Sequence, residues 1–228
     1  MPPLRRHQLA HLSAAGWREV LDRTWDDELR ACLQLWAQGN LPLVVTRQSA
    51  AREHDQAPVS LGLSAPTHCD RRRVALQVLP SRIAWFGEFP LLAEAVQQLP
   101  RTARPGLDAV CRALTTLGVK TRAYGSLGWQ HMTKLKYLHE RSDLDLWLAV
   151  DDVDQADAAA SVLLRHAPAA PRLDGELVFT DGSAVAWREW LAWRAGTCHS
   201  LLVKRLNGAS IEREPEHFPR AAGWARAA

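Results

Sequence analysis

The amino-acid sequence predicts an α+β fold, in which a mixed β-sheet with flanking helices follows a small α/β domain. Apolar residues recur at helical spacing in several segments, short alternating segments lie between them, and Asp181-Gly182 joins two of these as a hairpin. The chain has 228 residues, which is enough for one large domain or two small ones. The pattern changes between Glu88 and Pro105, so we expect an N-terminal domain over residues 1–90 and a second domain over residues 91–228.

The N-terminal domain contains one clear amphipathic helix and three short strands. Leu29, Leu33 and Trp36 recur at helical spacing, which predicts a helix over residues 25–38 that ends at Gly39-Asn40. Strands are expected over residues 43–46, 73–78 and 83–86. No motif in this part of the chain indicates chemistry.

The second domain begins with a helix in which Pro105 occupies the first turn and Gly118 follows the last. A strand over residues 119–124 then leads into Gly125-Ser126, and residues 127–141 have no regular pattern. The remaining expected elements are a strand over residues 143–150, a helix over 154–166, hairpin strands over 176–180 and 183–187, and a last strand over 200–206.

The composition narrows the class of protein. Hydrophobic residues make up 47% and charged residues 23% of the chain, as is typical of globular proteins. No apolar run approaches the ~18 residues of a membrane-spanning helix, and a net charge of +3 argues against a nucleic-acid-binding coat. The cysteines are too widely spaced for a zinc or redox pair motif, and no signal peptide is evident, so we expect a cytoplasmic protein with neither a membrane nor a nucleic acid as partner.

The segment from Ser142 to Leu146 carries the strongest signal for chemistry. Successive side chains of a strand point to opposite faces, so Asp143 and Asp145 project together, within ~7 Å of each other. Aspartate is depleted in strands and like charges repel, but a shared divalent cation would remove this conflict. A solvated strand end is the alternative explanation of the pair.

Gly125-Ser126 strengthens the first interpretation. A glycine at the end of a strand lets the backbone approach a phosphate, and the serine adds a hydroxyl and an exposed amide. A strand, Gly-Ser, and then a strand with Ser-Asp-x-Asp resembles the signature of the nucleotidyltransferase superfamily, which includes DNA polymerase beta. The resemblance implies a nucleotidyltransferase-like sheet and two Mg²⁺ ions, held by Asp143, Asp145 and a third acid on a neighbouring strand. Glu176 is our choice for that acid, with Asp174 and Asp181 as rivals in nearby turns.

A longer set of segments is similar to a narrower family, the phosphoribosyl-dephospho-CoA transferases of malonate decarboxylase systems, also called holo-(acyl carrier protein) synthases. The similarity centres on Tyr124-Gly125-Ser126-Leu127-Gly128-Trp129-Gln130, Met132-Thr133, Tyr137-Leu138 and the Asp143-Asp145 motif. Leu41–Val45, Leu61–Leu63, Asp174–Glu176 and Ala184–Glu189 extend it over nearly the whole chain. Lys134 departs from the pattern, because a small residue such as glycine is expected after Thr133.

This resemblance implies transfer of a prosthetic group from 2'-(5''-triphosphoribosyl)-3'-dephospho-CoA to a serine of the malonate decarboxylase acyl carrier protein, with release of pyrophosphate. The nucleophile then belongs to the partner protein. Asp143, Asp145 and Glu176 are the expected catalytic and metal-binding residues. The expected substrate-binding residues are the glycine and serine of the cradle and four further side chains: Gly125, Ser126, Lys134, Lys136, Trp147 and Lys204. For Lys134 and Lys136, a solvated basic loop is the alternative.

The sequence leaves two other functions open. One is nucleotide transfer to the hydroxyl of a small molecule by an enzyme of the same fold. The other is a catalytically inactive nucleotide-binding or antitoxin module. Transfer assays with small hydroxyl compounds, and measurements of Mg²⁺-dependent triphosphate binding, distinguish these functions from modification of a carrier protein.

Overall fold

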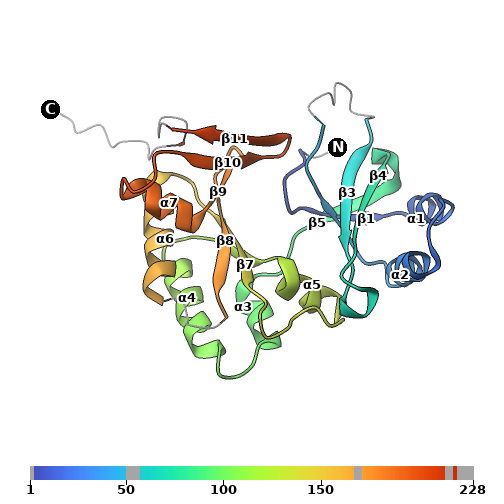
Figure 1. The fold of residues 1–228 in the computed structure, drawn as a ribbon, viewed down its shortest axis with the longest axis horizontal. Helices are drawn as coiled ribbons and strands as arrows, with labels where there is room; N and C mark the ends of the chain where they lie inside the picture. The colour runs from blue at the N-terminus through green and yellow to red at the C-terminus, as the bar shows by residue number, and fades with distance from the viewer. Residues whose placement is uncertain (1–2, 50–56, 167–170, 214–217, 220–228) are drawn as a thin grey trace. The chain divides into compact units, whose positions relative to one another are not determined.

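The chain forms two compact units, which are drawn in Figure 1. The computed structural model describes residues 3–49, 57–166, 171–213 and 218–219. The first unit contains the described residues up to Phe89 together with residues 132–137 and 206–208, and the second contains the others. The fold is α+β with one antiparallel and one mixed sheet, which confirms the predicted class. None of the helices in the described part of the chain is long and apolar enough to span a membrane.

The first unit is built on a five-stranded antiparallel sheet with the strand order β4-β3-β2-β1-β5. Its strands are β1 (Leu9–Leu12), β2 (Leu43–Val45), β3 (Val59–Ser64), β4 (Arg73–Val78) and β5 (Ile83–Gly87). The helices of this unit are α1 (Ala14–Leu21) and α2 (Asp27–Gln38), with single 3₁₀ turns η1 (Thr67–Cys69) and η2 (Pro80–Arg82). Strands β1 and β3 and helix α1 were not predicted from the sequence, although Val59, Leu61 and Leu63 of β3 alternate with small polar residues or glycine.

Helix α2 shows how local chemistry sets an element's bounds. The side chain of Asp26 accepts a hydrogen bond of 2.8 Å from the Leu29 amide, so Asp26 is the N-cap and the helix begins at Asp27, two residues after the expected start. Leu29, Leu33 and Trp36 are buried, as their spacing predicted. Burial of this apolar face supplies most of the stability of such a short helix.

The second unit is built on a six-stranded mixed sheet with the order β11-β10-β9-β8-β7-β6. Its strands are β6 (Thr121–Ala123), β7 (Leu144–Ala149), β8 (Leu173–Val178), β9 (Ala184–Ala186), β10 (Leu201–Arg205) and β11 (Gly208–Glu212). Strands β7 and β8 are parallel, whereas β6 pairs with β7, and β8 with β9, in antiparallel fashion. The helices are α3 (Leu92–Ala95), α4 (Arg104–Thr116), α5 (Gly125–Thr133), α6 (Val153–His166) and α7 (Trp187–Arg194), with a 3₁₀ turn η3 (Val96–Gln98).

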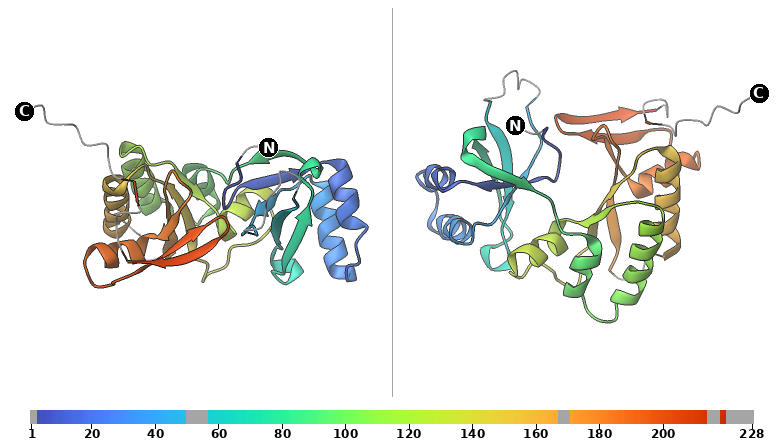
Figure 2. Two further views of the ribbon diagram at one scale, coloured as in Figure 1. Left: turned by 90° about the horizontal axis from the view of Figure 1, so that it is seen from above. Right: turned by 180° about the vertical axis from the view of Figure 1, so that it is seen from behind.

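One face of the central strand β7 forms the core of this unit. Leu144, Leu146 and Leu148 are completely buried and belong to one apolar cluster with residues of α4 and α6. These two helices lie side by side in both views of Figure 2. Because side chains alternate along a strand, the other face of β7 carries Asp145 and Trp147, which are only partly buried.

Two elements of the second unit differ from the prediction, and both bear on the candidate site. Helix α5 occupies residues that had no regular pattern in the sequence. Strand β8 begins at Leu173 rather than Glu176, because its pairing with β7 starts at the Leu144–Leu173 pair. Asp174 therefore lies on a strand and not in a turn.

Candidate active site

Asp143 and Asp145 lie at the start of β7, but in different surroundings. Asp143 is exposed and immediately precedes the strand, which begins at Leu144 and not at Asp143 as expected. Asp145 lies within the strand and is partly buried, and its backbone carbonyl accepts a hydrogen bond of 3.0 Å from the Tyr124 amide. A turn closed by Ser142, whose amide donates to the His139 carbonyl at 2.9 Å, leads the chain into this strand.

Gly125 lies against the carboxylate of Asp145. Its backbone has a φ of +57°, and a Cβ atom at this position would lie 1.8 Å from Oδ2 of Asp145 and 2.8 Å from its Cγ. Any side chain here would collide with the carboxylate, so only glycine satisfies both the backbone conformation and the contact. The Gly-Ser segment and Asp145 are therefore neighbours in space, as the sequence motif predicted.

Helix α5 begins at Gly125, and its amino end adds hydrogen-bond donors beside Asp145. The Gly128 amide is bonded to the Tyr124 carbonyl at 3.2 Å, so the amides of the preceding turn have no partner within the helix. Amides at a helix N-terminus and the positive end of the helix dipole attract phosphate groups. Donors for a phosphate and a carboxylate for a cation thus lie next to each other.

Two further acids face the same side of the sheet from β8. Asp174 is the registered partner of Asp145 across the parallel pair, and Glu176 is the partner of Trp147. Burial raises the pKa of Asp145 to about 6, and the negative charges of Asp174, Asp143 and Glu176, in that order, add to the rise. The site therefore holds an excess of negative charge that a bound cation would offset.

Glu176 and Asp174 differ in their availability as ligands. Glu176 is 4% exposed, and its Oε1 lies 2.7 Å from Nζ of Lys204 on β10. That ion pair already neutralises Glu176, so Asp174 is better placed to be the third carboxylate. Asp181, the other rival, accepts hydrogen bonds from the Ser183 amide (2.9 Å) and hydroxyl (2.6 Å), which is the capping interaction of a tight turn.

The side chains fit a hard divalent cation in their chemistry. Asp143, Asp145 and Asp174 offer only carboxylate oxygens, which are the ligands that Mg²⁺ prefers, and Gly125 has no side chain that would displace the Asp145 carboxylate. Across the described ranges, no three His, Cys, Asp or Glu side chains stand close enough together to hold a metal ion. Binding would therefore require these carboxylates to converge on the ion.

The comparisons with known proteins decide the family. Residues 5–89 match the family model described as the phosphoribosyl-dephospho-CoA transferase MdcG N-terminal domain, and residues 91–215 match the one described as its C-terminal domain. The chain belongs to the phosphoribosyl-dephospho-CoA transferase family. Both halves of the chain thus have counterparts in the family, as the resemblance in the sequence implied.

Curated relatives support this assignment over most of the chain. A protein named phosphoribosyl-dephospho-CoA transferase from Bradyrhizobium diazoefficiens is 37% identical over 214 residues, which cover 92% of this chain and 88% of the relative. One of the same name from Xanthomonas axonopodis pv. citri is 35% identical over 222 residues, covering 95% of each chain. Another, from Xanthomonas campestris pv. campestris, is 35% identical over 188 residues, covering 82% of this chain and 85% of the relative. No solved structure matches the chain significantly.

The three lysines expected to bind substrate do not all belong to the same compact unit of this transferase. Lys134 and Lys136 belong to the first compact unit, where the Lys136 carbonyl accepts hydrogen bonds from the amide (3.0 Å) and hydroxyl (2.7 Å) of Thr67. Lys204 belongs to the second unit and is paired with Glu176. The substrate-binding roles of Lys134, Lys136, Trp147 and Lys204 stay predictions.

Asp174 lies on a strand, whereas the sequence interpretation placed it in a turn. Its signal was the alternation of Leu173, Gly175 and Leu177 with two acids between them, which is typical of a strand with one buried face. Gly175 made the strand pattern harder to recognise, because glycine is common in turns and rare within strands. In the structure a Cβ on Gly175 would lie 2.3 Å from the Leu146 carbonyl oxygen, so the glycine marks close contact between β8 and β7 and not a turn.

Proposed function

We propose that this protein transfers the phosphoribosyl-dephospho-CoA group from 2'-(5''-triphosphoribosyl)-3'-dephospho-CoA to a serine hydroxyl of the malonate decarboxylase acyl carrier protein. The new bond joins the serine oxygen to the phosphorus nearest the ribose, and the hydroxyl proton is released to solvent. The bond from that phosphorus to the next phosphate breaks, and pyrophosphate leaves with the electron pair. The identity of the donor is supported by the chain's membership of the phosphoribosyl-dephospho-CoA transferase family. The contact between Gly125 and Asp145 is the observation that carries the proposal, because it joins a phosphate cradle to an acidic site.

In this proposal the residues of the second unit bind and orient the triphosphate. The amides in the first turn of α5 donate hydrogen bonds to phosphate oxygens, and Gly125 lets those oxygens approach the backbone. Asp145 lies on β7, and its carboxylate lies directly beside Gly125 of the cradle. Lys204 keeps Glu176 neutralised and leaves Asp174 free to act with Asp145.

Asp143, Asp145 and Asp174 would hold two magnesium ions, the number that the resemblance to the superfamily implies. When bound, the metal lowers the pKa of the attacking hydroxyl and neutralises charge on the departing pyrophosphate. Burial and, after it, the neighbouring acids raise the pKa of Asp145, and a bound cation would offset both effects, which supports this assignment. We place Glu176, the acid first expected from the sequence, outside this ligand set.

A transfer assay tests the proposal directly. The protein, the triphosphoribosyl donor and Mg²⁺ are incubated with apo acyl carrier protein, and the carrier is weighed by mass spectrometry. We expect the carrier to gain the mass of the phosphoribosyl-dephospho-CoA group, one pyrophosphate to be released per transfer, and chelation by EDTA to stop both.

Matched variants locate the chemistry. Asp143→Asn and Asp145→Asn should abolish transfer, whereas Asp154→Asn, which changes an exposed acid in the first turn of α6, should retain it. Transfer of a nucleotide from ATP to small hydroxyl compounds, with an unmodified carrier, would instead indicate an antibiotic-modifying type of enzyme. Triphosphate binding without any transfer would indicate an inactive binding module.

A further inference from the structure

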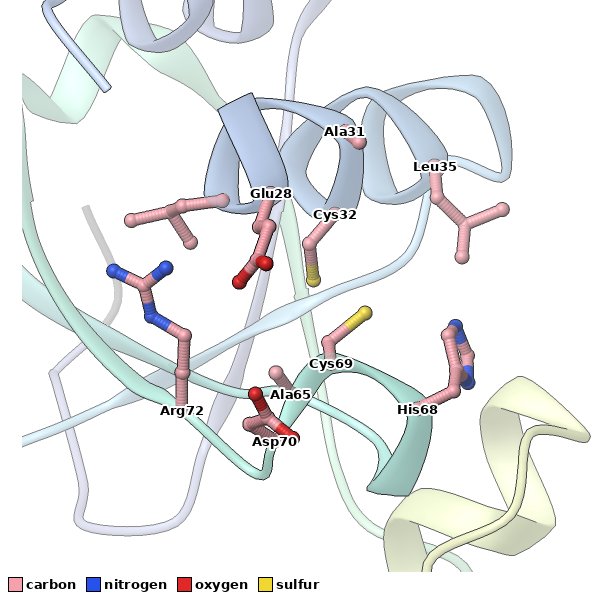
Figure 3. A pocket seen from close by; sticks show the side chains of 10 residues that line it. Glu28, Ala31, Cys32, Leu35, Ala65, His68, Cys69, Asp70 and Arg72 are labelled. Atoms are coloured by element: carbon pink, nitrogen blue, oxygen red, sulfur yellow. The ribbon is translucent and has the colours of Figure 1, made fainter. Parts of the chain in front are cut away.

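A pocket of about 340 Å³ in the first unit brings together two cysteines that are far apart in the sequence. Cys32 extends into it from α2, and Cys69 extends into it from η1 (Figure 3). Figure 3 shows the two sulfur atoms pointing toward one another. Linear spacing gave no sign of a thiol pair, because only the folding of the sheet places η1 beside α2.

The two thiols differ in exposure. Cys32 is 2% exposed, whereas Cys69 is partly exposed. Burial and the neighbouring Cys69 raise the pKa of Cys32 to about 12, so Cys32 is held as a thiol at neutral pH. Cys69 is therefore the sulfur that a reagent from solution reaches first.

A salt bridge holds the two cysteine-bearing segments together. Both guanidinium NH₂ groups of Arg72 donate to the Asp26 carboxylate, at 2.7 and 2.6 Å. Asp26 is the N-cap of α2, and Arg72 lies three residues after Cys69. This bidentate contact fixes the loop against the helix that carries Cys32, so the sulfur atoms are kept in position to react.

We propose that Cys32 and Cys69 form a reversible disulfide, which makes this pocket a site of oxidative modification by peroxide. The Cys69 thiolate attacks one oxygen of hydrogen peroxide, the O–O bond breaks, and the hydroxide that leaves takes a proton to become water. Cys32 then loses its proton and attacks the Cys69 sulfur, the S–S bond forms, and the sulfenic hydroxyl leaves as a second water. Two thiols lose two electrons in total, and one peroxide is reduced to two waters.

The bond would also act on a neighbouring segment of the same unit. Thr67, at the start of η1, donates two hydrogen bonds to the Lys136 carbonyl, and Tyr137 donates one of 2.8 Å to the Ser64 carbonyl. A bridge from α2 to η1 limits the opening of η1, so the contact between Thr67 and Lys136 should open less often. The Thr67 amide, which makes one of these bonds, reports on this effect.

Mass spectrometry tests the proposal on the full-length chain. Reduced protein is treated with hydrogen peroxide, blocked with iodoacetamide under denaturing conditions and weighed. We expect two fewer alkylated thiols, a linked pair of tryptic peptides covering residues 31–47 and 53–71, and full reversal by dithiothreitol. In hydrogen exchange, the Thr67 amide should exchange at least about threefold more slowly after oxidation.

Single variants provide the controls. Cys32→Ser and Cys69→Ser should each abolish the linked peptides, whereas Cys111→Ser and Cys198→Ser should leave them unchanged. Phenylarsine oxide, which bridges two close thiols, should bind the parent chain one to one and neither of the first two variants, and this readout needs no oxidation. Stepwise oxidation of Cys69 to sulfinic acid without a linked peptide, or arsenical binding that survives Cys32→Ser in folded protein, would overturn the proposal.

Discussion

The carboxylate of Asp145 occupies the volume that a side chain at Gly125 would need, with Oδ2 only 1.8 Å from the position of a Cβ atom. The same glycine has a left-handed backbone, at a φ of +57°. Two separate constraints therefore act on one residue, a conformational one and a steric one. The conformational constraint should affect stability, and the steric constraint should affect activity. A matched pair of variants separates the two effects.

Gly125→Ala should lower transfer activity by at least about a hundredfold, because the methyl group displaces the Asp145 carboxylate by an ångström or more. The control is Gly182→Ala, since Gly182 also has a positive φ (+83°) but no atom within 4 Å of an added Cβ. Both variants should lose roughly 1 kcal/mol of stability from the backbone term. Steady-state kinetics and thermal unfolding measure the two effects, and equal activity of the two variants would show that the contact with Asp145 is unimportant.

The choice of third carboxylate predicts an asymmetry between two variants. Asp174→Asn should lower kcat by roughly a hundredfold or more and raise the Mg²⁺ concentration needed for half-maximal activity, because a ligand is lost. Glu176→Gln should change the Mg²⁺ requirement much less, since Glu176 is already paired with Lys204 at 2.7 Å. A Mg²⁺ titration of the transfer reaction measures both, and the reverse order would restore Glu176 as the metal ligand.

Lys204→Met should destabilise the protein by roughly 3 kcal/mol, because it leaves a buried carboxylate without its cation. Adding Glu176→Gln should recover most of that loss, since the second change removes the unpaired charge. Lys120→Met, at an exposed position before β6, is the control and should have little effect. Urea unfolding measures the three variants. If Lys204 also binds substrate, the double variant will be stable but will show a raised KM for the donor.

Lys134 adopts a left-handed backbone, at a φ of +61°, directly after the last residue of α5. Such a conformation costs a non-glycine residue about 1 kcal/mol, and glycine is the usual residue after the end of a helix. Lys134→Gly should therefore raise the free energy of unfolding by about 1 kcal/mol, whereas Lys134→Ala should not. Thermal unfolding of the two variants separates the backbone effect from loss of the charge.

Asp26 predicts a pH dependence of stability. The hydrogen bonds from Arg72 and from the Leu29 amide lower the pKa of Asp26 from 3.8 to about 2 in the folded protein. Because the pKa of Asp26 is lower in the folded than in the unfolded protein, the ionised carboxylate stabilises the fold above pH 4. This stabilisation is lost as the pH falls from about 4 to 2. Asp26→Asn keeps a good N-cap but removes the charge, so its melting temperature should approach that of the parent in this range. Asp27→Asn is the control, and a constant difference across the pH range would contradict the assignment.

Local patterns in the sequence determined much of this protein. The spacing of Leu29, Leu33 and Trp36 predicted α2, and Pro105 and Gly118 bracketed α4, because such signals depend only on residues within a few turns of the chain. The alternation around Asp145 likewise predicted β7 with one acidic face and one buried face. The Gly-Ser and Asp-x-Asp motifs were expected to lie close together in space, and in the structure Gly125 lies against Asp145.

The tertiary structure decided which distant residues meet. Asp174 joins Asp145 only because β8 pairs with β7 in parallel, and Glu176 is neutralised only because β10 carries Lys204 past it. Cys32 and Cys69 meet for the same reason, since α2 and η1 are separated by two strands along the chain. Strand pairing and ion pairs between distant segments depend on register and packing, which no local spacing encodes. The pairing of Asp174 with Asp145 and the pair of thiols are therefore seen only in the folded chain.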